Sequence, residues 1–140
     1  MASELRVNTL KDAAGNNSVG MEYVAEGSAK AWVNFNGTGT IAARDSLNFS
    51  SLTDHGTGSH SVTFSASFSN NDYAIQLTGV QNSTSSGNQV WGVYSNGSWI
   101  NGDANVATGT FRMHGRFQNT GGAQDQDADV ISATIQGDLA

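Results

Sequence analysis

Short alternations of apolar and polar residues recur along the chain, and they indicate β-strands rather than helices. In residues 31–36, Ala31, Val33 and Phe35 fall on one side of an extended segment, and Trp32 falls on the other. The same alternation occurs in residues 62–68, 73–77, 111–117 and 131–135. Helical periodicity is nearly absent. The pattern therefore predicts a chain of short, half-buried strands.

Clusters of Gly, Thr, Asn and Ser separate these segments and supply the residues that tight turns require. They occupy residues 36–40, 53–59 and 69–72. Between them the chain has room for about eight or nine short strands at a spacing of about 8–14 residues. This spacing predicts an all-β fold, either an antiparallel β-sandwich or a barrel-like domain.

The first part of the chain is predicted to form a separate β-hairpin. Two brief alternations flank a Gly-Asn-Asn turn, so residues 4–23 are expected to pair as two strands around a long loop. A lone hairpin is only marginally stable in water, so it must pack on the body or on other copies of itself. We therefore divide the chain into a hairpin for oligomerisation or anchoring, residues 1–26, and a β-sandwich domain, residues 27–140. The apolar side chains assigned to this contact are Leu5, Val7, Leu10, Val19, Met21 and Tyr23.

The composition narrows the class of protein. The net charge is −6 and the basic residues form no run, which argues against binding to a nucleic-acid backbone. No stretch reaches the ~18 apolar residues of a membrane span, and the N-terminus lacks the apolar core of a signal peptide. The absence of cysteine excludes disulfides and thiol catalysis. The absence of proline leaves strand edges unguarded, so we expect neighbouring subunits to cover them in a homo-oligomer.

The histidines raise the question of a metal site. His55 and His60 flank a turn, and such spacing across a turn is a weak ligand pattern. His114 alternates with Arg112 and Arg116 on the polar side of a predicted strand. We expect these histidines to be solvated, so no metal site and no cofactor are predicted.

Three aspartates near the C-terminus, Asp125, Asp127 and Asp129, resemble the opening of a calcium-binding loop. The glycine and the glutamate that such a loop needs are replaced by Val130 and Gln136. We expect a surface acidic cluster, with a weak calcium site or an intersubunit arginine contact as the alternative. The sequence also lacks a nucleophile elbow, a phosphate-binding loop and a zinc-protease motif, so no catalytic residue and no enzymatic activity are predicted.

An aromatic segment, residues 91–102, combines two Trp and one Tyr with Asn, Ser and Gly. The favoured interpretation is that the Trp side chains fill a thin core around a hairpin turn. The alternative is a recognition surface, because rigid aromatic faces beside short polar side chains suit binding to sugars and proteins. The residues assigned to such receptor binding are Tyr94, Asn96, Trp99 and Asn101.

Three segments carry a family resemblance: ASELRVNTLKDAAGNN, AKAWVNFNGTGTIAARDSLNFSSLTDHGTG and IQGDLA. They are similar to a family of short tail fibre or virion structural proteins from tailed bacteriophages, notably phages of marine bacteria and cyanobacteria. The resemblance covers both ends and the first half of the chain, whereas the region from residue 70 to residue 125 diverges.

This resemblance implies a β-rich homotrimer on the virion. With 140 residues and no internal repeat, the chain is too short for a complete fibre, so we expect a compact appendage. The expected function is a non-enzymatic, trimeric tail fibre or appendage subunit that presents its β-sandwich for host attachment. Its partners would be other virion proteins and a host surface glycan or protein, after synthesis in the host cytoplasm. The alternative is a trimeric capsid decoration protein, and a less favoured one is a depolymerase that acts on surface polysaccharide.

Overall fold

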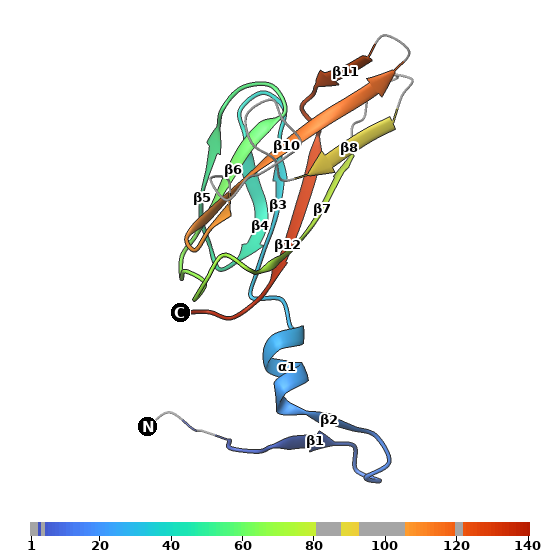
Figure 1. Ribbon diagram of the computed structural model, residues 1–140, viewed down its shortest axis with the longest axis vertical. Helices are drawn as coiled ribbons and strands as arrows, with labels where there is room; N and C mark the ends of the chain where they lie inside the picture. Colours follow the sequence, from blue (N-terminus) through green and yellow to red (C-terminus); the bar gives the residue numbers. More distant parts are fainter. Residues whose placement is uncertain (1–2, 4, 81–87, 93–105, 120–121) are drawn as a thin grey trace.

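The computed structural model describes residues 3, 5–80, 88–92, 106–119 and 122–140. Two antiparallel sheets face each other, and a slender N-terminal segment extends from one end of the pair (Figure 1). The predicted fold class is confirmed: the chain is an all-β sandwich preceded by a two-stranded hairpin. We call the end of the sandwich next to the N-terminal segment the near end, and the opposite end the far end.

One sheet has four strands in the part of the chain that the structure describes, in the order β4-β3-β12-β7. Their bounds are β3 (Ala31–Asn36), β4 (Ala42–Leu47), β7 (Ala74–Val80) and β12 (Val130–Gln136). Both central strands bury every second residue, as their alternation predicted. Strand β12 pairs with β7 over its whole length, which fixes the register of the C-terminal segment.

The other sheet is centred on the long strand β10 (Thr110–Asn119). The remaining strands are β5 (Phe49–Asp54), β6 (Ser59–Phe64), β8 (Asn88–Gly92), β9 (Val106–Ala107) and β11 (Gly122–Asp125). Strands β6 and β11 share one edge of β10, and β8 and β9 share the other. The prediction of one strand over residues 62–68 was wrong at its end, because β6 stops at Phe64 and only Phe68 forms a further bridge, to Leu139.

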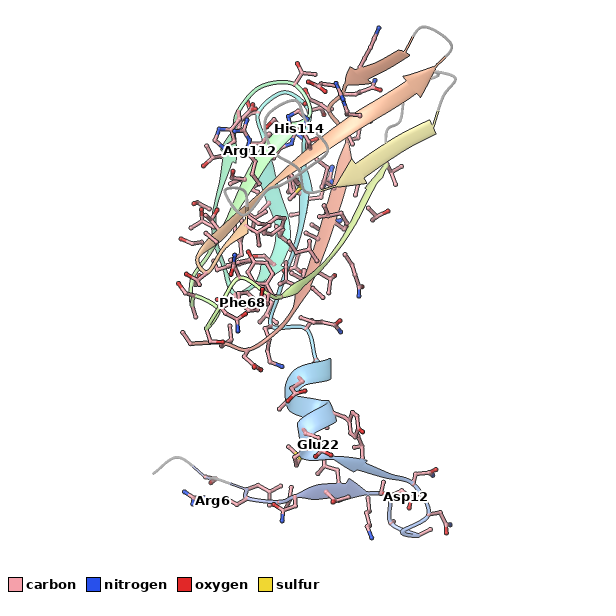
Figure 2. All side chains as sticks on the ribbon, viewed as in Figure 1. Arg6, Asp12, Glu22, Phe68, Arg112 and His114 are labelled. Carbon is pink, nitrogen blue, oxygen red and sulfur yellow. The ribbon has the colours of Figure 1, made fainter. Side chains whose placement is uncertain are left out.

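The apolar core lies between the two sheets. Phe35 and Phe111 are fully buried there, and burial of such a side chain stabilises the fold by about 1.5–3 kcal/mol. Toward the near end, Phe68 packs against Phe64 and Tyr73, with ring centroids 4.9 Å and 4.6 Å apart respectively. Figure 2 shows Phe68 toward the end of the sandwich from which the N-terminal segment departs.

The N-terminal segment is shorter in its strands than predicted and contains a helix. Strand β1 (Thr9–Lys11) pairs with β2 (Ser18–Gly20), and α1 (Met21–Gly27) follows at once. Met21 and Tyr23, predicted to lie on the second strand, are therefore helical, and Leu5 and Val7 precede the first strand. The physical reason is composition: the run from Met21 to Glu26 is rich in Met, Glu and Ala, which favour helix. We call residues 5–27 the arm.

Candidate functional site

Among the residues that the structure describes, most of the large apolar side chains left exposed lie on the arm. Leu5 is 79% exposed and Tyr23 is 70% exposed, and Val7, Leu10 and Val19 are each more than a third exposed. Helix α1 has no buried residue. Large apolar side chains left exposed together on one segment are typical of a contact with another protein. The residues predicted for oligomerisation or anchoring thus share the arm, although Met21 is only half-exposed.

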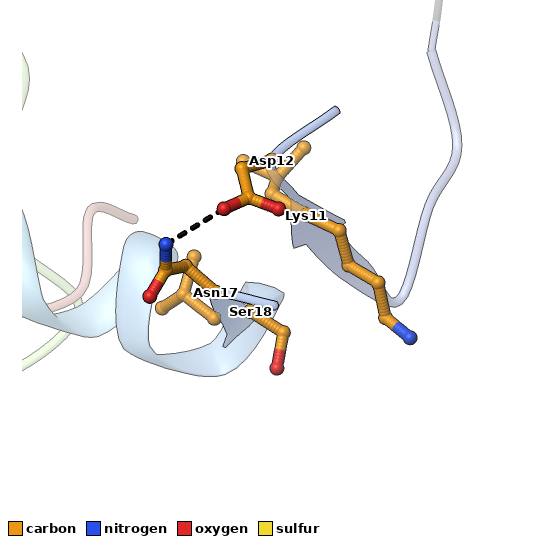
Figure 3. A pocket seen from close by; sticks show the side chains of 6 residues that line it. Lys11, Asp12, Asn17 and Ser18 are labelled. Carbon is orange, nitrogen blue, oxygen red and sulfur yellow. Dashed lines mark hydrogen bonds between the residues drawn. The ribbon is translucent and has the colours of Figure 1, made fainter. Parts of the chain in front are cut away.

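The loop of the hairpin is organised by Asp12. Its carboxylate accepts a hydrogen bond from the backbone amide of Asn16 at 2.9 Å. It accepts another from the side-chain amide of Asn17 at 2.6 Å, which Figure 3 shows. The bond from the Asn17 side chain is the main reason why the pKa of Asp12 lies below its usual value. Gly15 adopts a positive φ of 73° inside this loop. The loop therefore holds a defined shape although all its residues are exposed.

A shallow pocket of about 280 Å³ lies on the hairpin beside this loop (Figure 3). Leu10 and Val19 are directly opposed across the two strands, so their side chains share one face and provide its apolar floor. The residues that line it are Leu10, Lys11, Asp12, Asn17, Ser18 and Val19. The hairpin thus offers a small apolar depression with a polar rim, which suits an apolar side chain from another molecule.

The arm joins the sandwich through a few polar contacts at the near end. The side-chain amide of Gln136, on β12, donates to the carbonyl of Gly27 at 2.8 Å. The ammonium of Lys30 donates to the carbonyl of Ala25 and to the hydroxyl of Ser28, the latter at 2.6 Å. The bonds to Gly27 and Ala25 satisfy carbonyls at the end of α1 that have no partner within the helix. Helix α1 is therefore held at its C-terminal end, while the hairpin extends beyond it (Figure 1).

The histidines do not behave alike. His55 is exposed, as predicted, with its Nε2 atom 2.8 Å from the hydroxyl of Ser61. The prediction of a solvated side chain was wrong for His60, which is 0% exposed and meets the ring of Phe35 edge-on at 5.6 Å. The signal was present in the sequence, because His60 shares its strand parity with the buried residues Val62 and Phe64.

His114 is also buried, at 7% exposure, so the expectation of a solvated polar face was wrong for this residue too. Its Nδ1 atom lies 3.7 Å from the carboxylate of Asp125, which Arg116 binds at 2.8 Å. Arg112 donates to the hydroxyl of Ser59 at 2.9 Å, and Figure 2 places Arg112 and His114 toward the far end. Burial is the main reason why the pKa of His114 is lowered.

The three aspartates predicted to form a surface acidic cluster each bind a different residue. Asp125 pairs with Arg116 of the same chain, Asp127 accepts the backbone amide of Gly58 at 2.6 Å, and Asp129 accepts the hydroxyl of Thr38 at 3.2 Å. Within the residues that the structure covers, no group of three or more His, Asp or Glu is placed to hold a metal ion. Each aspartate links its own segment to another segment of the chain.

The residues assigned to receptor binding, Tyr94, Asn96, Trp99 and Asn101, lie outside the described residues, so their role stays a prediction. Comparison of the chain with protein-family models, curated proteins and solved structures finds no match. Among the helices of the described part, none is long and apolar enough to cross a membrane. The exposed apolar side chains of the arm are therefore the main structural evidence on function.

Proposed function

We propose that this chain is a non-enzymatic bacteriophage virion protein, a trimeric tail fibre or appendage subunit. In this proposal the arm joins three copies to one another, and the sandwich faces outward for host attachment. The observation that carries the proposal is the exposed apolar surface of the arm, which extends away from the sandwich core (Figure 1).

The energetic argument starts from the size of the arm. Strands β1 and β2 have three residues each, and a two-stranded hairpin is marginal in water by itself. Leu10 and Val19 contact each other but stay more than a third exposed, so the hairpin has no core of its own. Removing apolar surface from water is worth about 25 cal/mol per Å². Arms from neighbouring copies would supply that burial for each other.

The bacteriophage setting rests on the resemblance of the three segments given above. Two of these segments lie in the arm and in strands β3 to β5 of the sandwich. These are the parts that related proteins with the same assembly would share. The divergent region after residue 70 includes the aromatic segment assigned to receptor binding.

The first test is the mass of the protein in solution. We expect three times the 14.6 kDa of one chain at micromolar concentration, measured by light scattering or sedimentation. A stable monomer or dimer under these conditions would contradict the trimer.

The second test separates the arm from the rest of the surface. Leu10→Ser and Tyr23→Ser should shift the mass toward the monomer, because they remove exposed apolar surface from the arm. Val80→Ser is the matched control, since Val80 is 57% exposed but lies on edge strand β7 of the sandwich. Deletion of residues 1–24 should likewise abolish association or attachment to the particle. An assembly that survives the deletion would exclude the arm as the contact.

The third test addresses host attachment. The purified protein should bind host cells and compete with phage for adsorption, and Trp99→Ala should weaken both. If the protein binds no cells but is located on the head of intact particles, capsid decoration becomes the function. Release of reducing ends from host polysaccharide would contradict the non-enzymatic assignment.

A further inference from the structure

A histidine ring is buried at the far end of the sandwich. His60 is 0% exposed, and in the described part of the chain neither ring nitrogen makes a hydrogen bond of normal geometry, although the Gly37 backbone is close enough to favour a charged ring. The nearest charged oxygen is Oδ1 of Asp127, at 3.9 Å from Nε2, which is too long for a hydrogen bond. Buried polar atoms left unsatisfied are rare and costly, so each of them calls for an explanation.

The same oxygen of Asp127 already has a structural role. It accepts the backbone amide of Gly58 at 2.6 Å, which ties the β11–β12 connection (residues 126–129) to the β5–β6 turn (residues 55–58). Gly58 in turn accepts the amide of Gly115 at 2.7 Å, and Gly115 accepts the amide of Gln126 at 3.0 Å. These bonds form a closed set, in which the Asp127 carboxylate is the one side-chain member.

We propose that His60 and Asp127 form an acid-sensitive latch at the far end of the sandwich. While the imidazole is neutral, Asp127 holds the amide of Gly58. When the imidazole takes up a proton, it gains a charge and a donor and draws the carboxylate of Asp127, 3.9 Å away, toward the ring. A movement of about 1 Å brings the two groups to the length of a charge-assisted hydrogen bond. Asp127 then leaves Gly58, and the connection separates from the turn.

The groups around His60 set the direction of the response. Burial is the main cause that lowers the pKa of His60 below its ordinary value of 6.5. Asp127, Asp54 and the Gly37 backbone favour the charged ring, whereas His55 opposes it. The charge on the ring is therefore disfavoured in the folded protein and unhindered in the unfolded chain.

The sign of the pH dependence follows. The free energy of unfolding is independent of His60 above pH 6.5 and falls as the pH drops from 6.5 toward the lower pKa of the folded state. Below that pKa the loss is complete. His114 acts in the same direction: burial lowers its pKa, Arg112, Arg116 and His60 lower it further, and Asp125 opposes them.

The wild-type chain provides the decisive measurement. NMR follows the His60 ring and the hydrogen-exchange protection of the Gly58 and Gln126 amides while the pH is lowered from about 7.5 until the ring titrates. We expect titration below 6.5 and, at the same pH, a fall of about 10-fold or more in the protection of Gly58. Titration at or above 6.5, or a Gly58 amide that stays protected once His60 is charged, overturns the latch.

Variants identify the groups. In His60→Leu, the decrease in Tm on acidification should be smaller than in the wild type. His55→Gln removes the group that opposes the charged ring, so its acid transition should move to higher pH. Asp127→Asn retains an oxygen for the Gly58 amide but removes the charge that favours protonation, so the acid transition should move to lower pH. An acid response that is the same in the wild type and in both His60→Leu and Asp127→Asn contradicts the proposal.

Discussion

At the scale of single residues, Gly58 shows how closely the far end is packed. Its φ of +72° lies in the region that favours glycine. A Cβ atom at this position would lie 2.5 Å from the carbonyl oxygen of Gly115 and 2.8 Å from the amide nitrogen of Gln126. Both are backbone atoms in the hydrogen-bonded set described above, so neither can move aside without breaking it.

Gly58→Ala should therefore destabilise the protein more than Gly39→Ala does. Gly39 has a similar φ of +62° but open space around its Cα, so its substitution costs only the backbone strain, roughly 1–2 kcal/mol. The overpacking at Gly58 should add about 1–3 kcal/mol. Urea unfolding of the two variants measures the difference. Equal free energies of unfolding would show that the backbone around Gly58 adjusts to the added Cβ atom at little cost.

The same residues mark what the sequence alone could predict. The strict alternation of Ala31, Val33 and Phe35 was enough to predict the inward face of β3, because burial follows strand parity. His60 was missed because its residue type suggested a solvated turn, whereas its parity placed it in the core. The pairing of Asp127 with Gly58 joins residues far apart in the chain, and no local pattern reveals such a contact.

At the scale of elements, the hairpin of the arm was predicted, but the helix that follows it was not. Val19, Met21 and Tyr23 alternate as a strand would, yet only the first is extended. Three alternating residues cannot distinguish a strand from a helix, and the contacts that hold α1 come from Lys30 and, more than 100 residues away, from Gln136. Exposure of the apolar set was not readable from sequence at all, because it depends on where the sandwich ends.

The hairpin gives a prediction at this scale. Asp12→Ala removes both acceptors of the loop, so the amide of Asn16 should lose its hydrogen-exchange protection. Asp12→Asn keeps one side-chain acceptor and should retain part of this hydrogen-exchange protection. In the wild type the protection should persist above pH 3.8 and disappear as the pH falls through the lowered pKa of Asp12. Unchanged exchange in Asp12→Ala would mean that the backbone bonds alone shape the loop.

At the scale of the whole molecule, association through the arm makes stability depend on concentration. Anything that binds the folded chain raises its stability by mass action, on the order of 2–3 kcal/mol for a 100-fold rise in concentration above the dissociation constant. The Tm of the wild type should therefore increase with protein concentration, as should that of Val80→Ser. The Tm of the double variant Leu10→Ser/Tyr23→Ser should stay constant. A wild-type Tm that does not change with protein concentration would contradict assembly in solution.

Both chain ends of the sandwich lie at its near end. The amide of Lys30 donates to the carbonyl of Ile135, and Leu139 bridges to Phe68, so the chain enters and leaves beside the arm (Figure 1). A reporter fused to Ala140 would crowd the surface on which assembly is proposed to depend. A short epitope inserted at Gly39, where the turn is open, would instead project from the opposite end. Imaging of tagged particles should use that position, because it leaves the arm unobstructed.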